Sequence, residues 1–189
     1  MINFVNFWDW KILGILNPFF ALHGGISNKI FAEYLIYSLP LILIVLWFFS
    51  SKGKIVALQA VFSAILAWPI IAFIIGKLVN RPRPFEVGAV QELILHRPTY
   101  SFPSDHAAAL FAVAFSIWLS GYKKLAILVF ILAIIISFYR VATGIHFPSD
   151  IIAGLVIGLI AALLIKLMNG ILQPIYNFII KMMKKIRLA

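Results

Sequence analysis

The stretch SFPSDHAAALFAV, residues 101–113, places a serine, an aspartate and a histidine at positions 104–106, directly before a long apolar run. Its tetrapeptide FPSD occurs again at residues 147–150, where His146 precedes it and another apolar run follows. Proline favours the first turn of a helix, and serine or aspartate favours its cap. Both copies are therefore predicted to begin helices, with polar side chains at the mouth of a membrane span.

The composition indicates an integral membrane protein. Of 189 residues, 63% are hydrophobic and only 12% are charged, and the mean hydropathy is +1.06. A soluble domain could not bury so much apolar surface, so a soluble protein is excluded. The length suits a single domain over residues 1–189, and because the chain contains no cysteine, disulfides and thiol chemistry are excluded as well.

Apolar segments long enough to cross a bilayer alternate with polar loops along the chain. A helix needs about 20 apolar residues to span the hydrocarbon core. The predicted spans are 31–50, 55–78, 103–120, 124–143 and 149–168. The expected fold is therefore an all-α, polytopic membrane helix bundle.

The two ends of the chain are amphipathic rather than uniformly apolar. Residues 1–24 are rich in phenylalanine and tryptophan but contain Asp9, Lys11 and Pro18, so they form either an interfacial helix or a sixth span. Residues 171–189 mix apolar side chains with lysine and arginine, a pattern typical of a basic amphipathic helix on a membrane face. The bundle thus has five or six transmembrane helices.

The charged residues divide unequally between the two faces that five spans create. One face carries no acidic residue and nine of the 16 basic ones, namely Lys52, Lys54, Lys123, Lys124, Lys166, Lys181, Lys184, Lys185 and Arg187. The positive-inside rule places this face in the cytoplasm. The net charge of +10 is thus explained by basic residues on the cytoplasmic face of a membrane protein. The expected partner is the lipid bilayer, and no nucleic-acid partner is expected.

Three polar patches from distant parts of the sequence share the opposite, outer face. They are KLVNRPRPF (77–85), SFPSDH (101–106) and YRVATGIHFPSD (139–150). Together they supply several cations, two histidines and a carboxylate, and arginine pairs with phosphate oxygens in a bidentate geometry. Free N–H groups at the two predicted helix starts add a preference for an anion. The outer face is therefore predicted to bind a phosphate group.

These patches resemble the three motifs of the type-2 phosphatidic acid phosphatase family, K-x6-R-P, P-S-G-H and S-R-x5-H-x3-D. Arg140, His146 and Asp150 match both spacings of the third motif, with Tyr139 in place of its serine. The second motif reads Pro-Ser-Asp-His at residues 103–106, with an aspartate in place of its glycine. The motifs and the spans between them cover about residues 75–165.

The first motif departs from the family pattern by one residue. It ends correctly in Arg83 and Pro84, but five residues rather than six separate Lys77 from Arg83, so the family's lysine position is Gly76. On a helix this slip turns a side chain by roughly 100°. Local unwinding of the helix before Pro82 would turn the Lys77 side chain back toward the phosphate site.

The resemblance implies a metal-independent phosphatase without a cofactor. His146 would be the nucleophile that takes the phosphoryl group as a phosphohistidine, and Asp150 would hydrogen-bond the other ring nitrogen. His106 would protonate the leaving oxygen. The substrate-binding residues would be Lys77, Arg83, Ser104 and Arg140.

Several residues near the motifs have more than one interpretation. Arg81 either belongs to the phosphate site or reaches the interface and a lipid headgroup. His23 and His96 are interpreted as loop histidines outside the site. Asp105 either caps its helix or tunes His106.

Two other function classes compete with a phosphohistidine enzyme. A metal site could use His106, His146 and Asp150, and resistance of the activity to chelators would argue against it. A lipid carrier or scramblase could share the fold without catalysis, although the complete histidine and aspartate motifs argue for an enzyme.

The substrate of a phosphatase at the membrane surface would be a lipid phosphate or diphosphate. The segments RPRPF and FPSDH resemble those of the bacitracin-resistance-type undecaprenyl-diphosphate phosphatases. That resemblance implies a multi-pass protein of the bacterial plasma (inner) membrane, with its active site outside, that recycles the lipid carrier of peptidoglycan in cell wall biogenesis. Phosphatidylglycerophosphate, phosphatidic acid and lipid A phosphates are alternative substrates. The sequence does not indicate an oligomeric state.

Overall fold

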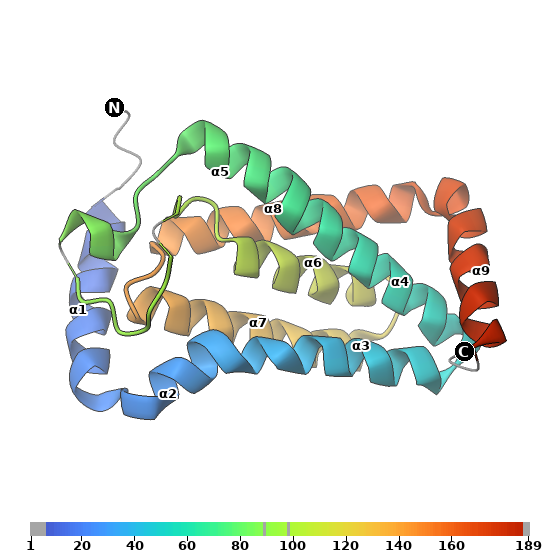
Figure 1. Ribbon diagram of the computed structural model, residues 1–189, viewed down its shortest axis with the longest axis horizontal. Coiled ribbons are helices and arrows are strands. Elements are labelled where there is room, and N and C mark those ends of the chain that lie inside the picture. The colour runs from blue at the N-terminus through green and yellow to red at the C-terminus, as the bar shows by residue number, and fades with distance from the viewer. Residues whose placement is uncertain (1–6, 89, 98, 187–189) are drawn as a thin grey trace.

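The computed structural model describes residues 7–88, 90–97 and 99–186. Within these residues the chain is helical and has no β-strand, which confirms the all-α prediction. The long helices run side by side and form an elongated bundle (Figure 1). Four helical segments are long and apolar enough to cross a membrane, namely Gly25–Phe49, Ser51–Val87, Lys123–Ala142 and Pro148–Leu167.

The first two of these segments are built from several helical pieces. The first combines α2 (Gly25–Lys29), η1 (Ile30–Tyr34), η2 (Leu35–Tyr37) and α3 (Ser38–Phe49). The second combines α4 (Ser51–Ile65), η3 (Leu66–Ala72) and α5 (Phe73–Val79), and it ends with the short η4 (Pro84–Val87). The π-helical turn η3 contains Pro69, whose nitrogen has no proton to donate to the preceding turn.

Helix α6 (Asp105–Leu119) is the buried centre of the bundle. It packs against α4, α7 (Lys123–Ala142) and α8 (Pro148–Leu167). The predicted span 103–120 corresponds to this apolar helix of 15 residues, which is shorter than the four candidate spans. It begins at Asp105 because Ser104 is its cap. All residues from Ala107 to Ala114 are buried, so α6 is shielded from lipid by its neighbours.

Small residues allow α6 and α8 to approach each other closely. A Cβ added at Gly154 would lie 2.7 Å from the Ala107 Cβ, and one added at Gly158 would lie 2.7 Å from the Ala112 nitrogen. Larger side chains at the two glycines would therefore push the helices apart. Close backbone approach through glycine and alanine is a common way to pack helices in membranes, where lipid removes the hydrophobic driving force between them.

This contact brings the two FPSD copies side by side. The Ser104 nitrogen donates a hydrogen bond of 3.1 Å to the Asp150 carbonyl. Both copies begin a helix, as predicted, but in different registers. Ser104 is the cap of α6, whereas Pro148 is the first residue of α8 and Asp150 lies in its first turn.

Two helices lie across the ends of the bundle, one at each end. Figure 1 shows α1 (Phe7–His23) at one end and α9 (Asn169–Lys185) at the other, both crossing the direction of the long helices. Helix α1 buries Asp9, Leu13 and Asn17, which are spaced four residues apart and share one face. The loop between α5 and α6 lies at the α1 end.

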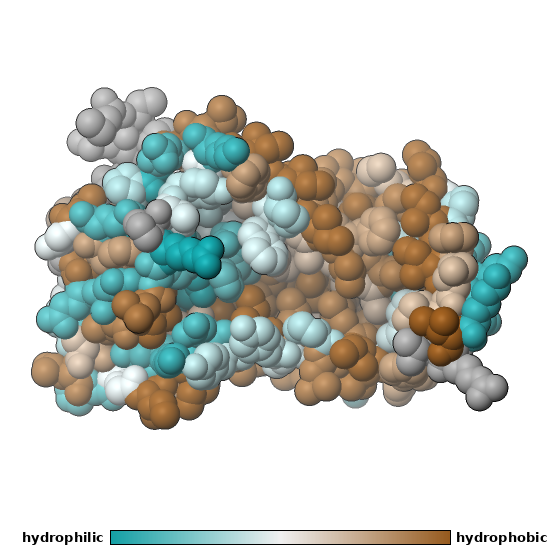
Figure 2. All heavy atoms as spheres, viewed as in Figure 1, coloured by the Kyte–Doolittle hydropathy of each residue, from teal (hydrophilic) through white to brown (hydrophobic). Residues whose placement is uncertain are grey.

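The surface divides along the same axis. Figure 2 shows hydrophilic side chains gathered at the α1 end of the visible face and hydrophobic side chains over its middle. A hydrophobic middle is what a bilayer requires of the outside of a helix bundle. The hydrophilic end contains the loop and the N-termini of α6 and α8, where the predicted site residues lie.

Candidate active site

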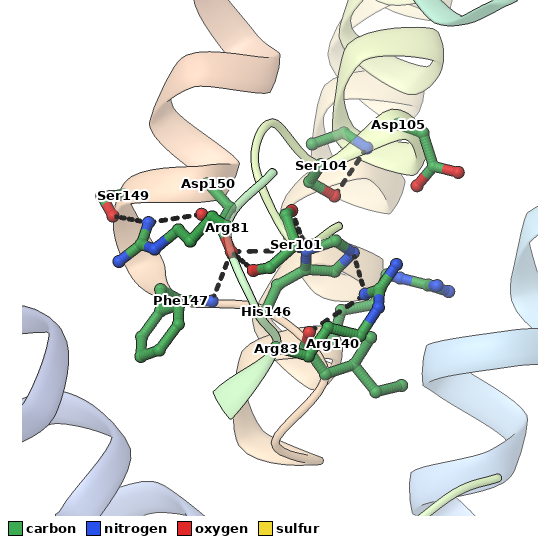
Figure 3. A network of polar contacts seen from close by, with 12 residues as sticks. Arg81, Arg83, Ser101, Ser104, Asp105, Arg140, His146, Phe147, Ser149 and Asp150 are labelled. Atoms are coloured by element: carbon green, nitrogen blue, oxygen red, sulfur yellow. Dashed lines mark hydrogen bonds and ion pairs between the residues drawn. The ribbon is translucent and has the colours of Figure 1, made fainter. Parts of the chain in front are cut away.

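The predicted catalytic residues meet where α6 and α8 begin and α7 ends. Figure 3 shows His146 with Ser101 and Asp150 on one side and Arg83 on the other. His146 follows α7 by a short turn, and Ser101 comes from the loop before α6. Residues that lie far apart in the sequence thus surround one imidazole ring.

The geometry around His146 defines which ring nitrogen can react. Its Nδ1 lies 2.9 Å from the Ser101 carbonyl oxygen and 3.5 Å from Asp150 Oδ2, so Nδ1 carries the proton. The Nε2 atom lies 3.3 Å from Arg83 Nη1, a donor, and therefore carries the lone pair. Burial lowers the pKa of His146 to about 4, with a further contribution from Arg83 that the Asp150 carboxylate opposes. The ring is therefore neutral at pH 7, and its free lone pair is on Nε2.

Asp150 is fixed by contacts on both of its oxygens. Oδ2 accepts hydrogen bonds from the Phe147 nitrogen at 2.8 Å and from the Ser101 hydroxyl. Oδ1 accepts a hydrogen bond of 2.6 Å from Arg81 Nη1. Ser101 therefore helps to orient both the carboxylate and His146, which the sequence analysis missed.

Arg81 is a buried part of this arrangement and does not reach the interface. Only 4% of it is exposed, and its guanidinium lies 4.0 Å from the centre of the Phe147 ring. It forms ion pairs with Asp150 at 2.6 Å and with Asp9 at 2.9 Å. Of the two interpretations of Arg81, the interfacial one is wrong, and the residue supports Asp150.

Asp9 connects the N-terminal helix α1 to the catalytic residues. Besides Arg81 it accepts hydrogen bonds from the Ser149 nitrogen at 2.9 Å and from the Ser149 hydroxyl at 2.7 Å. The anion at the start of α8 is thus the Asp9 carboxylate, which the helix dipole favours there. No motif pointed to Asp9, because it lies far from the motifs in an amphipathic segment.

The start of α6 is likewise occupied by groups of the chain itself. The His106 nitrogen donates to Asp105 Oδ1 at 2.8 Å, and the Ala107 nitrogen donates to the Ser104 hydroxyl at 3.4 Å. Two of the backbone N–H groups expected to bind phosphate at this helix start therefore already donate to side chains of α6 and its cap. The Ser104 hydroxyl keeps its own proton, which it can donate to a substrate.

Arg83 and Arg140 are buried arginines with neutral partners. Arg83 donates to the Ile145 carbonyl at 3.1 Å and to Thr99 Oγ1 at 3.0 Å. Arg140 donates to the Ala32 carbonyl and to His96, as described below. The Nε atoms of both arginines are buried and have no hydrogen-bond partner among the described residues. Both guanidinium groups thus keep N–H groups that an anion could bind.

His106 lies in the first turn of α6, where Asp105 holds its ring. Its Nδ1 lies 3.0 Å from Asp105 Oδ1, and its side chain is 25% exposed. Because Asp105 engages Nδ1, the other ring nitrogen is the one that can face a substrate. Of the two interpretations of Asp105, the contact with the His106 ring fits the second, since Ser104 and not Asp105 caps α6.

The predicted contact of Lys77 with phosphate stays a prediction, because among the described residues no hydrogen bond or ion pair joins Lys77 to the residues around His146. Helix α5 continues through Lys77 to Val79, so the unwinding that would redirect the lysine does not occur there. The Lys77 side chain is exposed, and its ammonium lies 4.5 Å from the centre of the Phe73 ring. A side chain at Gly76 would collide with the ring of Tyr100, so that position could not hold a lysine without rearrangement.

The arrangement favours phosphoryl chemistry over a metal site. Among the described residues, no three His, Cys, Asp or Glu side chains are grouped as metal ligands would be. His146 instead faces the Ser101 carbonyl with one nitrogen and a guanidinium with the other. A neutral nucleophile beside buried cations is suited to an anionic electrophile.

A family model places the chain among known proteins. The model described as PAP2 superfamily matches residues 56–172, which include all three motifs. The chain belongs to the PAP2 superfamily. This confirms the resemblance drawn from the motifs, and the chain is a membrane lipid phosphatase of this superfamily.

Individual relatives agree with this assignment. The "Bacitracin transport permease protein BcrC" of Bacillus licheniformis is 35% identical over 136 residues, which cover 71% of this chain and 66% of that protein. The "Undecaprenyl-diphosphatase BcrC" of Bacillus subtilis is 29% identical over 168 residues, 87% of this chain and 86% of that protein. The crystal structure of Aquifex aeolicus LpxE has the same fold, with a TM-score of 0.66 at 23% identity over 87% of this chain and 98% of that one.

The Asp9 contacts generate a test of the N-terminal helix. Removing one partner of a buried ion pair costs about 3–5 kcal/mol, and misplacing a catalytic group costs up to about 100-fold in rate. We therefore expect Asp9→Asn to lower the thermal unfolding temperature in detergent and to reduce kcat by about 10- to 100-fold, with little change in KM. Lys11→Gln, on the exposed side of the same helix, is the matched control. Wild-type stability and turnover in Asp9→Asn would show that α1 does not support the site.

Proposed function

We propose that the protein hydrolyses undecaprenyl diphosphate to undecaprenyl phosphate and phosphate through a phosphohistidine on His146. The observation that carries the mechanism is the state of this ring. Its proton lies on Nδ1 beside Ser101 and Asp150, and its Nε2 lone pair faces the Arg83 guanidinium. A neutral imidazole next to a cation is suited to attack a phosphoryl group that the same cation binds.

In the first step, Nε2 of His146 attacks the terminal phosphorus and the bond from phosphorus to the bridging oxygen breaks. His106 gives its proton to that oxygen, which leaves with the lipid phosphate. The imidazole becomes positively charged, and the carboxylate of Asp150, 3.5 Å from Nδ1, stabilises this charge.

In the second step, water attacks the phosphorus of the phosphohistidine. His106, now neutral, takes a proton from the water, the bond from phosphorus to nitrogen breaks, and phosphate is released. His146 and His106 then regain their starting protonation states. Each step transfers one proton through His106, so a single histidine serves as acid and then as base.

Two arginines are available to stabilise the charge of the phosphoryl group in both steps. Arg83 contacts Nε2 of His146 directly, so an oxygen on the attacked phosphorus would lie within its reach. Arg140 is buried, and its guanidinium donates to a carbonyl oxygen and an imidazole rather than to a carboxylate. Fixed cations in a site shielded from water can replace the metal ions of other phosphatases. We expect the activity to persist in the presence of chelators.

The choice of substrate rests on the relatives. The Bacillus subtilis relative, which this chain covers to 86%, carries the name undecaprenyl-diphosphatase. The permease name of the Bacillus licheniformis relative would suit a carrier, but the His146 and His106 arrangement supports catalysis. A role in recycling the lipid carrier of the cell wall, and in bacitracin resistance, follows from this substrate. Phosphatidylglycerophosphate, phosphatidic acid and lipid A phosphates belong in the substrate panel as comparisons.

The orientation follows from the charges at the two ends of the bundle. Lys52 and Lys123 lie at the starts of α4 and α7, and Lys166 lies in the last turn of α8. These positions are at the end covered by α9, opposite the site (Figure 1). By the positive-inside rule, the site faces outward from a bacterial plasma membrane, with α1 and α9 at the two interfaces.

Cysteine labelling can test this orientation, because the chain has no cysteine of its own. Leu95 is 94% exposed in the loop at the α1 end, and Lys124 lies in the first turn of α7 at the other end. An impermeant thiol reagent should label Leu95→Cys but not Lys124→Cys in intact cells, and both after permeabilisation. The reverse pattern in intact cells would invert the proposed topology.

Different leaving groups can separate the roles of the two histidines. A general acid typically contributes about 10²–10⁴-fold, and it matters most when the leaving group is a poor one. His106→Ala should therefore slow hydrolysis of a lipid monophosphate strongly and that of an activated aryl phosphate much less. His146→Ala should abolish both, because no leaving group compensates for a missing nucleophile.

The control for both variants is a folded protein, checked by thermal unfolding in detergent. Equal losses on both substrates in His106→Ala would make His106 a phosphate ligand rather than the acid. Full activity in His146→Ala would contradict the mechanism, whichever lipid is the substrate.

A further inference from the structure

The loop before α6 places a hydrogen-bond acceptor on each of the two arginines available to phosphate. Thr99 Oγ1 lies 3.0 Å from Arg83 Nη2. His96 Nε2 lies 3.1 Å from Arg140 Nη2. Arg83 directly precedes η4 and Arg140 lies in the last turn of α7. Both contacts involve a terminal guanidinium nitrogen, the kind of donor that binds phosphoryl oxygens.

The hydrogen bonds of His96 define it as an acceptor toward Arg140. Its Nδ1 lies 3.0 Å from the Arg97 carbonyl oxygen, so Nδ1 carries the proton and Nε2 the lone pair. Burial lowers the pKa of His96 to about 4, and the charges of Arg83 and Arg140 contribute. The ring is therefore neutral at pH 7, and it presents to Arg140 the same feature that a phosphoryl oxygen would, a lone pair. His96, interpreted from the sequence as a loop histidine outside the site, thus contacts one of the predicted substrate-binding arginines.

The partners of the three buried arginines differ in charge. Arg81 is bound by the carboxylates of Asp9 and Asp150. Arg83 and Arg140, in contrast, donate to neutral groups, among which are the hydroxyl of Thr99 and the imidazole of His96. Hydrogen bonds to an anion are about twice as strong as those between neutral partners. A phosphoryl dianion can therefore displace the neutral acceptors, whereas it could not displace two carboxylates.

The two acceptors lie on a short stretch between anchored parts of the loop. Upstream, the Leu93 nitrogen donates to the Thr143 carbonyl at 3.2 Å. Downstream, the Ser101 nitrogen donates to the Arg81 carbonyl at 2.7 Å. His96 and Thr99 can thus withdraw from the arginines while both ends of this stretch, and Ser101 beside His146, stay in place.

We propose that His96 and Thr99 are placeholders for phosphoryl oxygens, which hold Arg140 and Arg83 in position in the free enzyme and are displaced when the phosphoryl group binds. The inference rests on the proposed function, since it assigns these arginines to phosphate. Both loop residues are positioning residues in this account, because they act through the arginines. Buried guanidinium groups left without acceptors would be costly, so the placeholders keep the empty site ordered.

Direct binding of inorganic phosphate to the purified protein tests this role without turnover. The net free energy of one hydrogen bond corresponds to about a 2- to 10-fold change in an equilibrium constant. Because the placeholder competes with phosphate for Arg140, His96→Ala should bind phosphate about 2- to 10-fold more tightly than wild type in calorimetry. His96→Gln retains an acceptor and should stay close to wild type. His23→Ala, which removes an exposed histidine of α1, is the matched control.

Thr99→Val removes the acceptor on Arg83 and should also tighten phosphate binding, so it tests the proposal if His96→Ala does not fold. Weaker binding in both variants would make the two residues phosphate ligands and overturn the placeholder role. Unchanged binding in both would overturn it as well. Binding absent from the wild-type protein would instead contradict the proposed phosphoryl site itself, and this inference with it.

Discussion

The close contact between α6 and α8 is the constraint on which the rest of the site depends. Gly154 and Gly158 let α8 approach the backbone of α6 so closely that added side chains would collide with it. The Ser104 to Asp150 hydrogen bond then fixes the two helix starts next to each other. As a result the first turn of α6, which carries His106, lies beside the start of α8, which directly follows His146. Two short identical tetrapeptides mark these two starts, but the glycines and alanines beyond them determine that they meet.

Three buried arginines are distinguished by what binds them. Arg81 holds two carboxylates, Asp9 and Asp150, and so stabilises the group behind His146. Arg83 and Arg140 donate to neutral groups, among which are the hydroxyl of Thr99 and the imidazole of His96. Since an anion competes well with a hydroxyl or an imidazole and poorly with a carboxylate, the second pair is available to a substrate. The charge of the partners thus separates an arginine that supports the site from arginines that can bind phosphate.

The sequence predicted the centre of this arrangement and missed its surroundings. Residues such as Arg140, His146 and Asp150 were identified because their spacing matches a motif of the family that the chain resembles. Asp9 was missed because its contact with Arg81 joins residues 72 positions apart and has no periodic signal. Ser101 and His96 lie in a loop whose path depends on contacts with other parts of the fold. Only the place of Ser101 at the start of SFPSDH hinted at a role. The unwinding expected near Lys77 was wrong, because the proline-rich stretch did not show that α5 continues to Val79.

The most direct test of the account is detection of a phosphoryl group on His146 during turnover. Phosphohistidine forms only if Nε2 attacks the phosphorus, so its presence distinguishes covalent catalysis from direct attack by water. Brief mixing with a substrate labelled in its terminal phosphate, followed by an alkaline quench and peptide mapping, should place the label on the peptide that contains His146. The label should be lost on acid treatment and absent from His146→Ala. Turnover without any labelled peptide in rapid-quench samples, or a label that persists in His146→Ala, would contradict the account.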